Sequence, residues 1–366
     1  MKNQVNKAIF MLSHGRSGTT LLTKILTAHS QIHFIEREFN EFGRFYKRQV
    51  KYNKFGPKKY EIMTRDLFRR PRMIGLRISD FPYALTDWSK INNFRDWLDL
   101  IFNYFRKRSG KPIIGVKIMK NFYEVKNAIR NINLVKIEFP DAYYLQIIRD
   151  PRDVFLSFRK IKVSPWFLSP YYFGKFWSKI VMAIRSLDGS VHYLKIHYED
   201  LITKPRKEAE RFCNFLEIDF DPAMLRFYEK VTEKKFLGQN VAKDFISDNF
   251  NKWQKELKSM EVSLISAAAT SAMASFNYLP RDLDYKVNLW RKIWETIKTA
   301  VYIFINYFFF HFIWLKIDYF FGLCGLILKK YSPSFYWFLK HRFNEPDLAL
   351  KSGVSRWVLN ERNRLH

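Results

Sequence analysis

A glycine-containing segment near the N-terminus has the residue types of an anion-binding loop. Gly15-Arg16-Ser17-Gly18-Thr19-Thr20 lies between an apolar run, residues 8–12, and a helical apolar pattern over residues 21–26. The first turn of a helix carries backbone N–H groups without intrahelical partners, and its dipole favours a negative charge. Gly18 permits close approach of the backbone to a ligand, while the hydroxyls and the Arg16 guanidinium add hydrogen-bond donors. The segment therefore predicts a phosphate-binding loop between a strand and a helix.

Two other interpretations of this loop have different consequences. It also fits a plain strand-to-helix connection in which a threonine caps the helix. It does not fit the triphosphate-binding pattern G-x-x-x-x-G-K-[ST], because Arg16 stands two residues before Gly18 and no lysine directly follows Gly18. A nucleoside triphosphatase with this loop would lack the lysine that reaches the triphosphate.

A second group of polar residues follows another apolar run, residues 142–148. Arg149 comes directly after the run, Pro151 suits the first turn of a helix, and Ser157 lies two turns further on. One phosphate could be bound by Arg149 and Ser157 together. The alternative is a surface Arg149 paired with Asp153, with Ser157 facing solvent. Two anion sites at strand ends are typical of an open α/β sheet and favour the binding interpretation.

The elements that must position these residues follow a regular order. Helical patterns and strand-like apolar runs alternate along the chain, which predicts parallel βαβ units. The basic and aromatic stretch 37–70 is predicted to be a surface insertion that borders an acceptor cleft. The predicted strands cover residues 7–12, 72–78, 112–118, 142–148 and 191–197, and the predicted helices cover residues 19–28, 94–107, 122–137, 152–160, 172–187, 205–216 and 256–275.

The two polar motifs, in this order, resemble those of the sulfotransferase superfamily, whose members use 3′-phosphoadenosine 5′-phosphosulfate (PAPS). The resemblance covers residues 5–280. It implies a three-layer, P-loop-like α/β fold with a central parallel sheet. It also implies that the loop of residues 15–20 binds the 5′-phosphosulfate of PAPS, and that Arg149 and Ser157 bind its 3′-phosphate.

Two later stretches also resemble motifs of this superfamily. His197-Tyr198-Glu199-Asp200-Leu201 is similar to a third landmark, which implies that Tyr198 lies near the adenine. An aromatic residue after a strand is also a common part of a core, so packing is the alternative role of Tyr198. Asn251-Lys252-Trp253 is similar to the segment that closes over the cofactor, which implies that Lys252 contacts PAPS.

Sulfuryl transfer to a hydroxyl requires positive charge beside the leaving phosphate and a base for the acceptor proton. Arg16 is predicted to stabilise the leaving phosphate. The resemblance implies this role, because cytosolic relatives have a lysine and tyrosylprotein relatives an arginine at this position of the loop. Many cytosolic members have their catalytic histidine on the strand of residues 113–119, two residues after a lysine. This chain has Met119 there, after Lys117, so the histidine mechanism is not supported.

The general base is predicted to be a carboxylate. Tyrosylprotein and bacterial-type relatives have an acidic residue twenty positions after the loop arginine, and Glu36 has this position here. Burial would raise its pKa toward neutrality. The alternative role of Glu36 is a surface ion pair with a nearby arginine. Glu38 and His14 are the alternative bases.

The charge balance points to a further partner. The chain has 63 lysine and arginine residues against 35 aspartate and glutamate residues, a net charge of +28. A polyanionic cofactor accounts for only part of this excess, which indicates a larger anionic partner. We recognise no nucleic-acid motif, and the basic residues are spread along the chain, so an anionic membrane surface is predicted and nucleic acid is not.

The C-terminal region has a different composition from the rest. Residues 299–315 carry no formal charge, and a second apolar stretch covers residues 319–328. We expect a sulfotransferase domain over residues 1–285 and a helical, aromatic-rich, membrane-associating extension over residues 286–366. A bilayer span or hairpin, and a soluble subdomain packed on the enzyme or on a second subunit, are the alternatives.

The cysteine content and the position of the first predicted strand indicate the cellular compartment of the protein. The two cysteines have no metal or redox spacing, so neither a metal site nor a disulfide framework is expected. The first strand begins close to Met1, which predicts a cytoplasmic protein at the inner face of a membrane and differs from Golgi-type relatives.

Together these observations predict a PAPS-dependent sulfotransferase that acts on a hydroxyl of a lipid, sterol, glycan or glycolipid and could form a homo-oligomer. A soluble sugar or a phenol stays open as the acceptor. One alternative function is a kinase-like phosphotransferase, which the missing loop lysine and the lack of a distinct Asp-rich metal motif disfavour. The other is a non-catalytic protein that binds membranes or nucleic acid.

Overall fold

The computed structural model describes residues 7–38, 42–68, 80–120, 125–160, 169–189, 192–230, 248–279 and 287–308. By the contacts within the chain, it divides into two compact units, residues 1–292 and 293–366. The predicted domain boundary after residue 285 lies outside the described residues and stays a prediction. So do the predicted strand over residues 72–78 and the second apolar stretch over residues 319–328.

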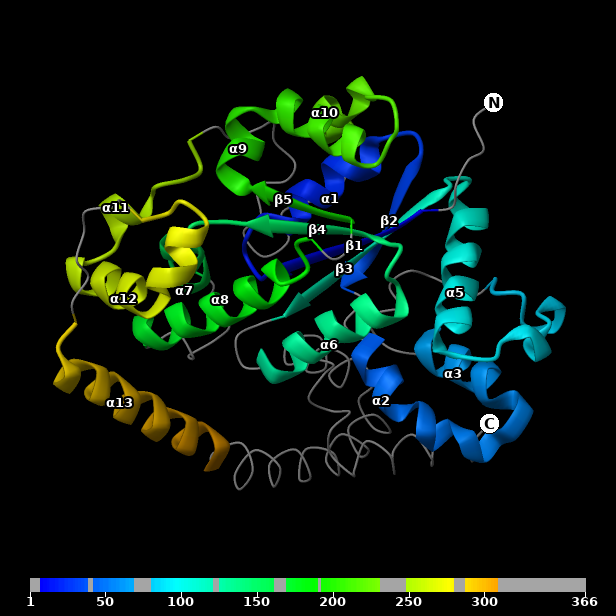
Figure 1. Cartoon of the computed structure of the whole chain (residues 1–366), viewed down its shortest axis with the longest axis horizontal. Coiled ribbons are helices and arrows are strands. Elements are labelled where there is room, and N and C mark those ends of the chain that lie inside the picture. Colours follow the sequence, from blue (N-terminus) through cyan, green and yellow to red (C-terminus); the bar gives the residue numbers. More distant parts are fainter. Residues whose placement is uncertain are drawn as a thin grey trace, which may run out of the picture. The chain divides into compact units, whose positions relative to one another are not determined.

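The centre of the first unit is a five-stranded sheet in which every pair of neighbours is parallel. The strand order is β2-β3-β1-β4-β5, so β1 lies between β3 and β4 (Figure 1). Nearly continuous apolar runs form the inner strands β1 and β4, as expected where helices cover both faces of a sheet. The strands are β1 Ala8–His14, β2 Ile32–Glu38, β3 Ile113–Lys120, β4 Tyr143–Ile148 and β5 His192–His197.

Helices follow the strands in sequence and cover the sheet (Figure 1). The α-helices are α1 Thr19–Ala28, α2 Phe42–Tyr52, α3 Lys59–Phe68, α5 Phe94–Ser109, α6 Val125–Glu138, α7 Pro151–Arg159, α8 Pro170–Arg185, α9 Tyr198–Thr203, α10 Pro205–Phe215, α11 Trp253–Glu256, α12 Ser259–Ser275 and α13 Leu289–Phe308. The 3-10 helices are η1 Asn53–Lys58, η2 Tyr83–Leu85, η3 Trp88–Lys90 and η6 Pro222–Lys230.

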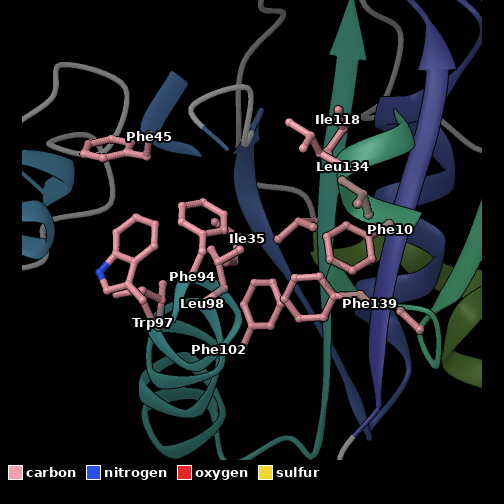
Figure 2. Close-up of a cluster of buried hydrophobic side chains, with 14 of the residues drawn as sticks. Phe10, Ile35, Phe45, Phe94, Trp97, Leu98, Phe102, Ile118, Leu134 and Phe139 are labelled. Carbon is pink, nitrogen blue, oxygen red and sulfur yellow. The ribbon is translucent and has the colours of Figure 1, made fainter. Parts of the chain in front are cut away.

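Alternate side chains of β1 enter two different cores, because successive residues of a strand point to opposite faces of the sheet. Phe10 packs in a cluster with residues of α5, α6 and α8 (Figure 2). Ile9 and Met11 pack in a second cluster with residues of α1, α9 and α10. Helices therefore cover both faces of a parallel sheet, which confirms the predicted three-layer α/β fold.

The apolar sides of α2 and α3 are part of the first core, so the prediction of a surface insertion is wrong for these two helices. The side chain of Phe45, from α2, is buried in the same cluster as Trp97 of α5 (Figure 2). Met63, from α3, is buried in this cluster too. Trp97 Nε1 also donates a hydrogen bond to Thr64 Oγ1, at 2.9 Å. The many basic residues suggested that these helices lie on the surface, but their apolar residues recur at helical spacing and pack on α5.

The helix α13 contains the start of the predicted apolar C-terminal stretch. None of the helices in the described part of the chain combines the length and the apolar character that a transmembrane span requires. The remainder of that stretch, residues 309–315, lies outside the described residues.

Candidate functional site

The polar motifs follow strands that all point the same way, so they gather at one edge of the sheet. The loop of residues 15–18 follows β1, Arg149 follows β4, and Tyr198 follows β5. After β1 the chain continues to β2, at one lateral end of the sheet, and after β4 it continues to β5, at the other end. The strand order therefore reverses between β1 and β4. Such a switch point at the carboxyl ends of parallel strands is where open α/β sheets bind ligands.

The backbone of the loop turns sharply between β1 and α1. Arg16 and Gly18 have left-handed conformations, with φ of 67° and 95°. Gly18 is the N-cap residue of α1, and no side chain of the described residues caps this end. The alternative in which a threonine caps the helix is therefore wrong, because Thr19 is already helical. The first-turn N–H groups of α1 stay directed at the edge of the sheet.

Gly18 also provides space for an aromatic ring. A Cβ atom at this position would lie 2.3 Å from Cδ2 of Tyr198, closer than any side chain tolerates. The ring of Tyr198 therefore lies directly over the loop. The sequence predicted that Gly18 permits close approach of the backbone to a ligand, but it did not predict the contact with Tyr198.

Arg16 extends from the loop to the helix that follows β4. Its Nε donates a hydrogen bond to Ser157 Oγ of α7, at 3.2 Å. Burial, and after it the positive charge of Arg149, lowers the pKa of Arg16. The two guanidinium groups are thus close enough to repel each other, and an anion between them would remove this repulsion.

Arg149 is buried, with 8% of its surface exposed. Its guanidinium donates a hydrogen bond to the backbone oxygen of Asn249, at 2.7 Å, and lies 4.3 Å from the ring centroid of Tyr198. Within the described part of the chain, its Nε has no hydrogen-bond partner, and neither does the buried Oγ of Ser17. Unpaired buried donors are costly, so both atoms indicate a missing acceptor.

The predicted alternative, an exposed Arg149 in an ion pair with Asp153, is wrong. Asp153 is itself buried, and its two carboxylate oxygens accept hydrogen bonds from the backbone N–H groups of Asn251 and Trp253, at 2.7 and 3.0 Å. Burial raises the pKa of Asp153, while the charge of Arg149 opposes this effect. Asp153 therefore fixes a distant segment of chain beside the loop that carries Arg149.

That segment contains a site residue that the sequence did not predict. Asn249 binds Arg149 through its backbone oxygen and donates its side-chain amide to the hydroxyl of Tyr198, at 2.7 Å. Lys252 precedes α11 and lies between the two residues that Asp153 binds. The nearby Asn-Lys-Trp motif pointed to this segment, but nothing in the sequence distinguished Asn249.

A buried polar network lies behind Arg149. Glu199 accepts hydrogen bonds from the backbone N–H of Asp150 and from the hydroxyl of Tyr278, at 3.1 and 2.8 Å. Burial raises the pKa of Glu199. Asp150 caps α7 by accepting from the N–H of Arg152, at 2.8 Å, and forms an ion pair with the same residue at 2.6 Å. This network holds the turn after β4, and therefore Arg149, in a defined position.

The alternative bases differ in what surrounds them. His14 is fully buried, with Phe158 and Phe173 packed edge-on against its ring. Its Nδ1 donates to the backbone oxygen of Gly15 at 2.8 Å, and burial lowers its pKa to about 4. A group with this pKa is a weak base near neutral pH, which disfavours His14 as the base.

The burial of His14 predicts a specific dependence of stability on pH. Its pKa is about 4 in the folded protein against 6.5 in the unfolded chain, so the unfolded chain binds the proton first and stability falls as the pH decreases from 6.5 to 4. We expect His14→Gln to remove this contribution. The difference in free energy of unfolding between wild type and variant should shrink by roughly 3 kcal/mol between pH 7 and pH 4. Urea denaturation at both pH values measures it, and a constant difference would contradict the assignment.

Glu36 and Glu38 belong to the carboxyl end of β2. The register of β2 against β3 shifts between Phe34 and Glu38, an irregularity of a kind that is common beside active sites. Because β3 separates β2 from β1, this end lies roughly 10 Å from the end of β1 at the same edge of the sheet. The side chains of Glu36, Glu38 and Met119 lie outside the described part of the structure.

The other predicted residues lie close to these groups in the chain. Lys117, on β3, is buried and is in register with Met11 of β1 and Glu38 of β2. Thr19 is buried and Thr20 is half-buried in the first turn of α1. The described residues contain no group of three or more histidine, cysteine, aspartate or glutamate side chains that could hold a metal ion.

Comparison with known proteins connects this geometry to a family. Residues 8–222 match the model of the sulfotransferase family. Protein-tyrosine sulfotransferase A of Caenorhabditis elegans is 24% identical over 251 residues, which cover 65% of this chain and 57% of the relative. Carbohydrate sulfotransferase 4 of Mus musculus is 28% identical over 164 residues, which cover 38% of this chain and 42% of the relative. The chain thus spans about half the length of these two relatives.

Among solved structures, the sulfotransferase domain of the Synechococcus PCC 7002 olefin synthase is similar with a TM-score of 0.48 and 22% identity. The match covers 75% of this chain and 96% of that domain.

Proposed function

The chain belongs to the sulfotransferase family, and on this basis we propose that it transfers a sulfuryl group from PAPS to a hydroxyl group of an acceptor. The observation that carries the proposal is the proximity of two guanidinium groups, those of the half-buried Arg16 in the loop before α1 and of the buried Arg149 after β4. A nucleotide with phosphate groups at both ends of its ribose is the ligand that such a pair suits.

The unpaired donors test whether the residues fit PAPS. Ser17 Oγ lies in the loop and Arg149 Nε lies after β4, so each of the two proposed phosphate sites has a buried donor without a partner among the described residues. We assign the loop of residues 15–20 to the 5′-phosphosulfate. Arg149 and Ser157 are assigned to the 3′-phosphate, and Tyr198 and Lys252 to the nucleoside.

Bound PAPS would supply a sulfuryl group attached to a phosphate that can leave. Arg16 and the first-turn N–H groups of α1 place positive charge where the leaving phosphate oxygen becomes more negative. Glu36 is proposed to take the proton from the acceptor hydroxyl as a general base. Its strand ends at the same edge of the sheet as the loop, on the side away from Arg149. We propose that the acceptor hydroxyl binds between this base and the leaving-group residues.

For the acceptor, we propose a hydroxyl on a lipid, sterol or glycolipid. The aromatic C-terminal region and the net charge of +28 support an amphiphilic acceptor at an anionic surface. The two curated relatives are named for protein tyrosine and for carbohydrate, so a tyrosyl peptide and a soluble glycan are the comparison acceptors.

Two measurements test the function. Calorimetry should show 3′-phosphoadenosine 5′-phosphate binding more than about tenfold tighter than ATP, because ATP has no 3′-phosphate for Arg149. Labelled PAPS, incubated with a lipid extract, a tyrosyl peptide or a soluble glycan, should then give a sulfated product that mass spectrometry identifies. Tighter binding of ATP would favour the kinase-like alternative. Binding of neither nucleotide would favour the non-catalytic one.

A further inference from the structure

The helix α13 has its apolar face exposed. Six large apolar side chains of this helix are between 38% and 76% exposed: Leu289, Trp290, Ile293, Trp294, Ile297 and Val301. At about 100° per residue, they fall within one arc of roughly 140°, which we call the α13 apolar face. A helix of a globular protein normally turns such an arc toward the core. Here the side chains of this arc are exposed.

The opposite arc of α13 is polar and basic. It contains the buried Glu295, which accepts a hydrogen bond from Lys298 Nζ at 3.0 Å. Lys298 borders the apolar face on one side and Lys292 on the other, by the same helical spacing. The helix contains three basic residues and one acidic residue. A lysine therefore borders the apolar face on each side.

We propose that the α13 apolar face docks on an anionic membrane surface. Apolar side chains that include tryptophan, bordered by lysine, are the pattern of a helix that lies in the headgroup region of a bilayer. The net charge of +28 adds attraction to anionic lipid. A second copy of this chain is a poorer occupant, because two molecules of this charge repel each other. The uncharged sequence from Thr299 to Leu315 continues the apolar character beyond the face.

Cosedimentation of the full-length protein with lipid vesicles tests the proposal. The protein should pellet with vesicles of phosphatidylcholine and phosphatidylserine, and at least about tenfold less with phosphatidylcholine alone or at high salt. The double variant Ile297→Asp, Val301→Asp should lose at least about tenfold in affinity for the mixed vesicles. A second variant, Trp290→Ser with Trp294→Ser, should give a loss in the same direction.

The matched control carries the same substitutions on other exposed surfaces. Ile137 and Val50 are each 70% exposed, so Ile137→Asp with Val50→Asp changes charge and hydrophobicity equally. This control should bind the mixed vesicles like wild type, and all variants should keep the thermal midpoint of wild type. Equal binding by test and control variants would overturn the proposal. The proposal would also be overturned if the wild-type protein does not bind the vesicles but forms a dimer, and the double variant Ile297→Asp, Val301→Asp dissociates that dimer.

Discussion

Replacing Glu36 by glutamine is expected to lower turnover by about 100-fold or more, while the affinity for 3′-phosphoadenosine 5′-phosphate stays nearly unchanged. An amide has the shape of the carboxylate but cannot accept the proton of the acceptor hydroxyl. The proposed nucleotide site lies instead at the loop after β1 and at Arg149 after β4, and β3 separates both of these strand ends from β2, the strand of Glu36. Turnover with saturating PAPS, together with calorimetry, measures the two effects separately.

The controls for this variant use the neighbouring candidates. Glu38→Gln and the surface substitution Glu61→Gln should keep most of the activity, since Glu61 forms an ion pair with Arg65 on α3. Arg16→Ala should reduce both turnover and nucleotide affinity, because Arg16 is assigned to the leaving phosphate. If Glu36→Gln is nearly as active as wild type and Glu38→Gln or His14→Ala is inactive, Glu36 is not the base.

Replacing Arg149 by alanine should weaken binding of 3′-phosphoadenosine 5′-phosphate by roughly ten- to a hundredfold, the value of a hydrogen bond between charged groups. The physical reason is that Arg149 is buried and that its Nε has no hydrogen-bond partner among the described residues. The variant should also lose the preference for this nucleotide over adenosine 5′-phosphate, which lacks the 3′-phosphate. Calorimetry with both nucleotides measures the ratio of affinities.

The ratio of the two affinities distinguishes loss of 3′-phosphate recognition from a general disturbance of the site by the Arg149→Ala substitution. Arg149 also holds Asn249 and packs on Tyr198, so its loss could weaken both nucleotides through the surrounding chain. Such an effect would leave the preference for the 3′-phosphate intact, and that result would contradict the assignment. Arg149→Lys should be intermediate, because lysine keeps the charge but not the planar fork. Arg206→Ala, at an exposed pair with Glu210, should bind both nucleotides normally.

The sequence by itself determined the local architecture of the site. An apolar run followed by glycine, hydroxyl residues and a helical pattern could only be a strand, a loop and a helix, and α1 begins at Thr19 as predicted. Likewise, Pro151 is the first residue of α7, directly after the strand that delivers Arg149. These features were predictable because turn formation, helix starts and hydrophobic periodicity depend on residues close together in the chain.

The tertiary structure alone decided which side chains meet. Arg16 contacts Ser157 across 141 positions, and Arg149 contacts Asn249 across 100. The strand order that places β1 between β3 and β4 brings these segments together, and no local pattern records that order. The same reason explains why one side of the helices α2 and α3 proved to be part of the core. The lysines and arginines lie on one side of each helix. Burial of the other side depends on contact with α5, which is distant in the sequence.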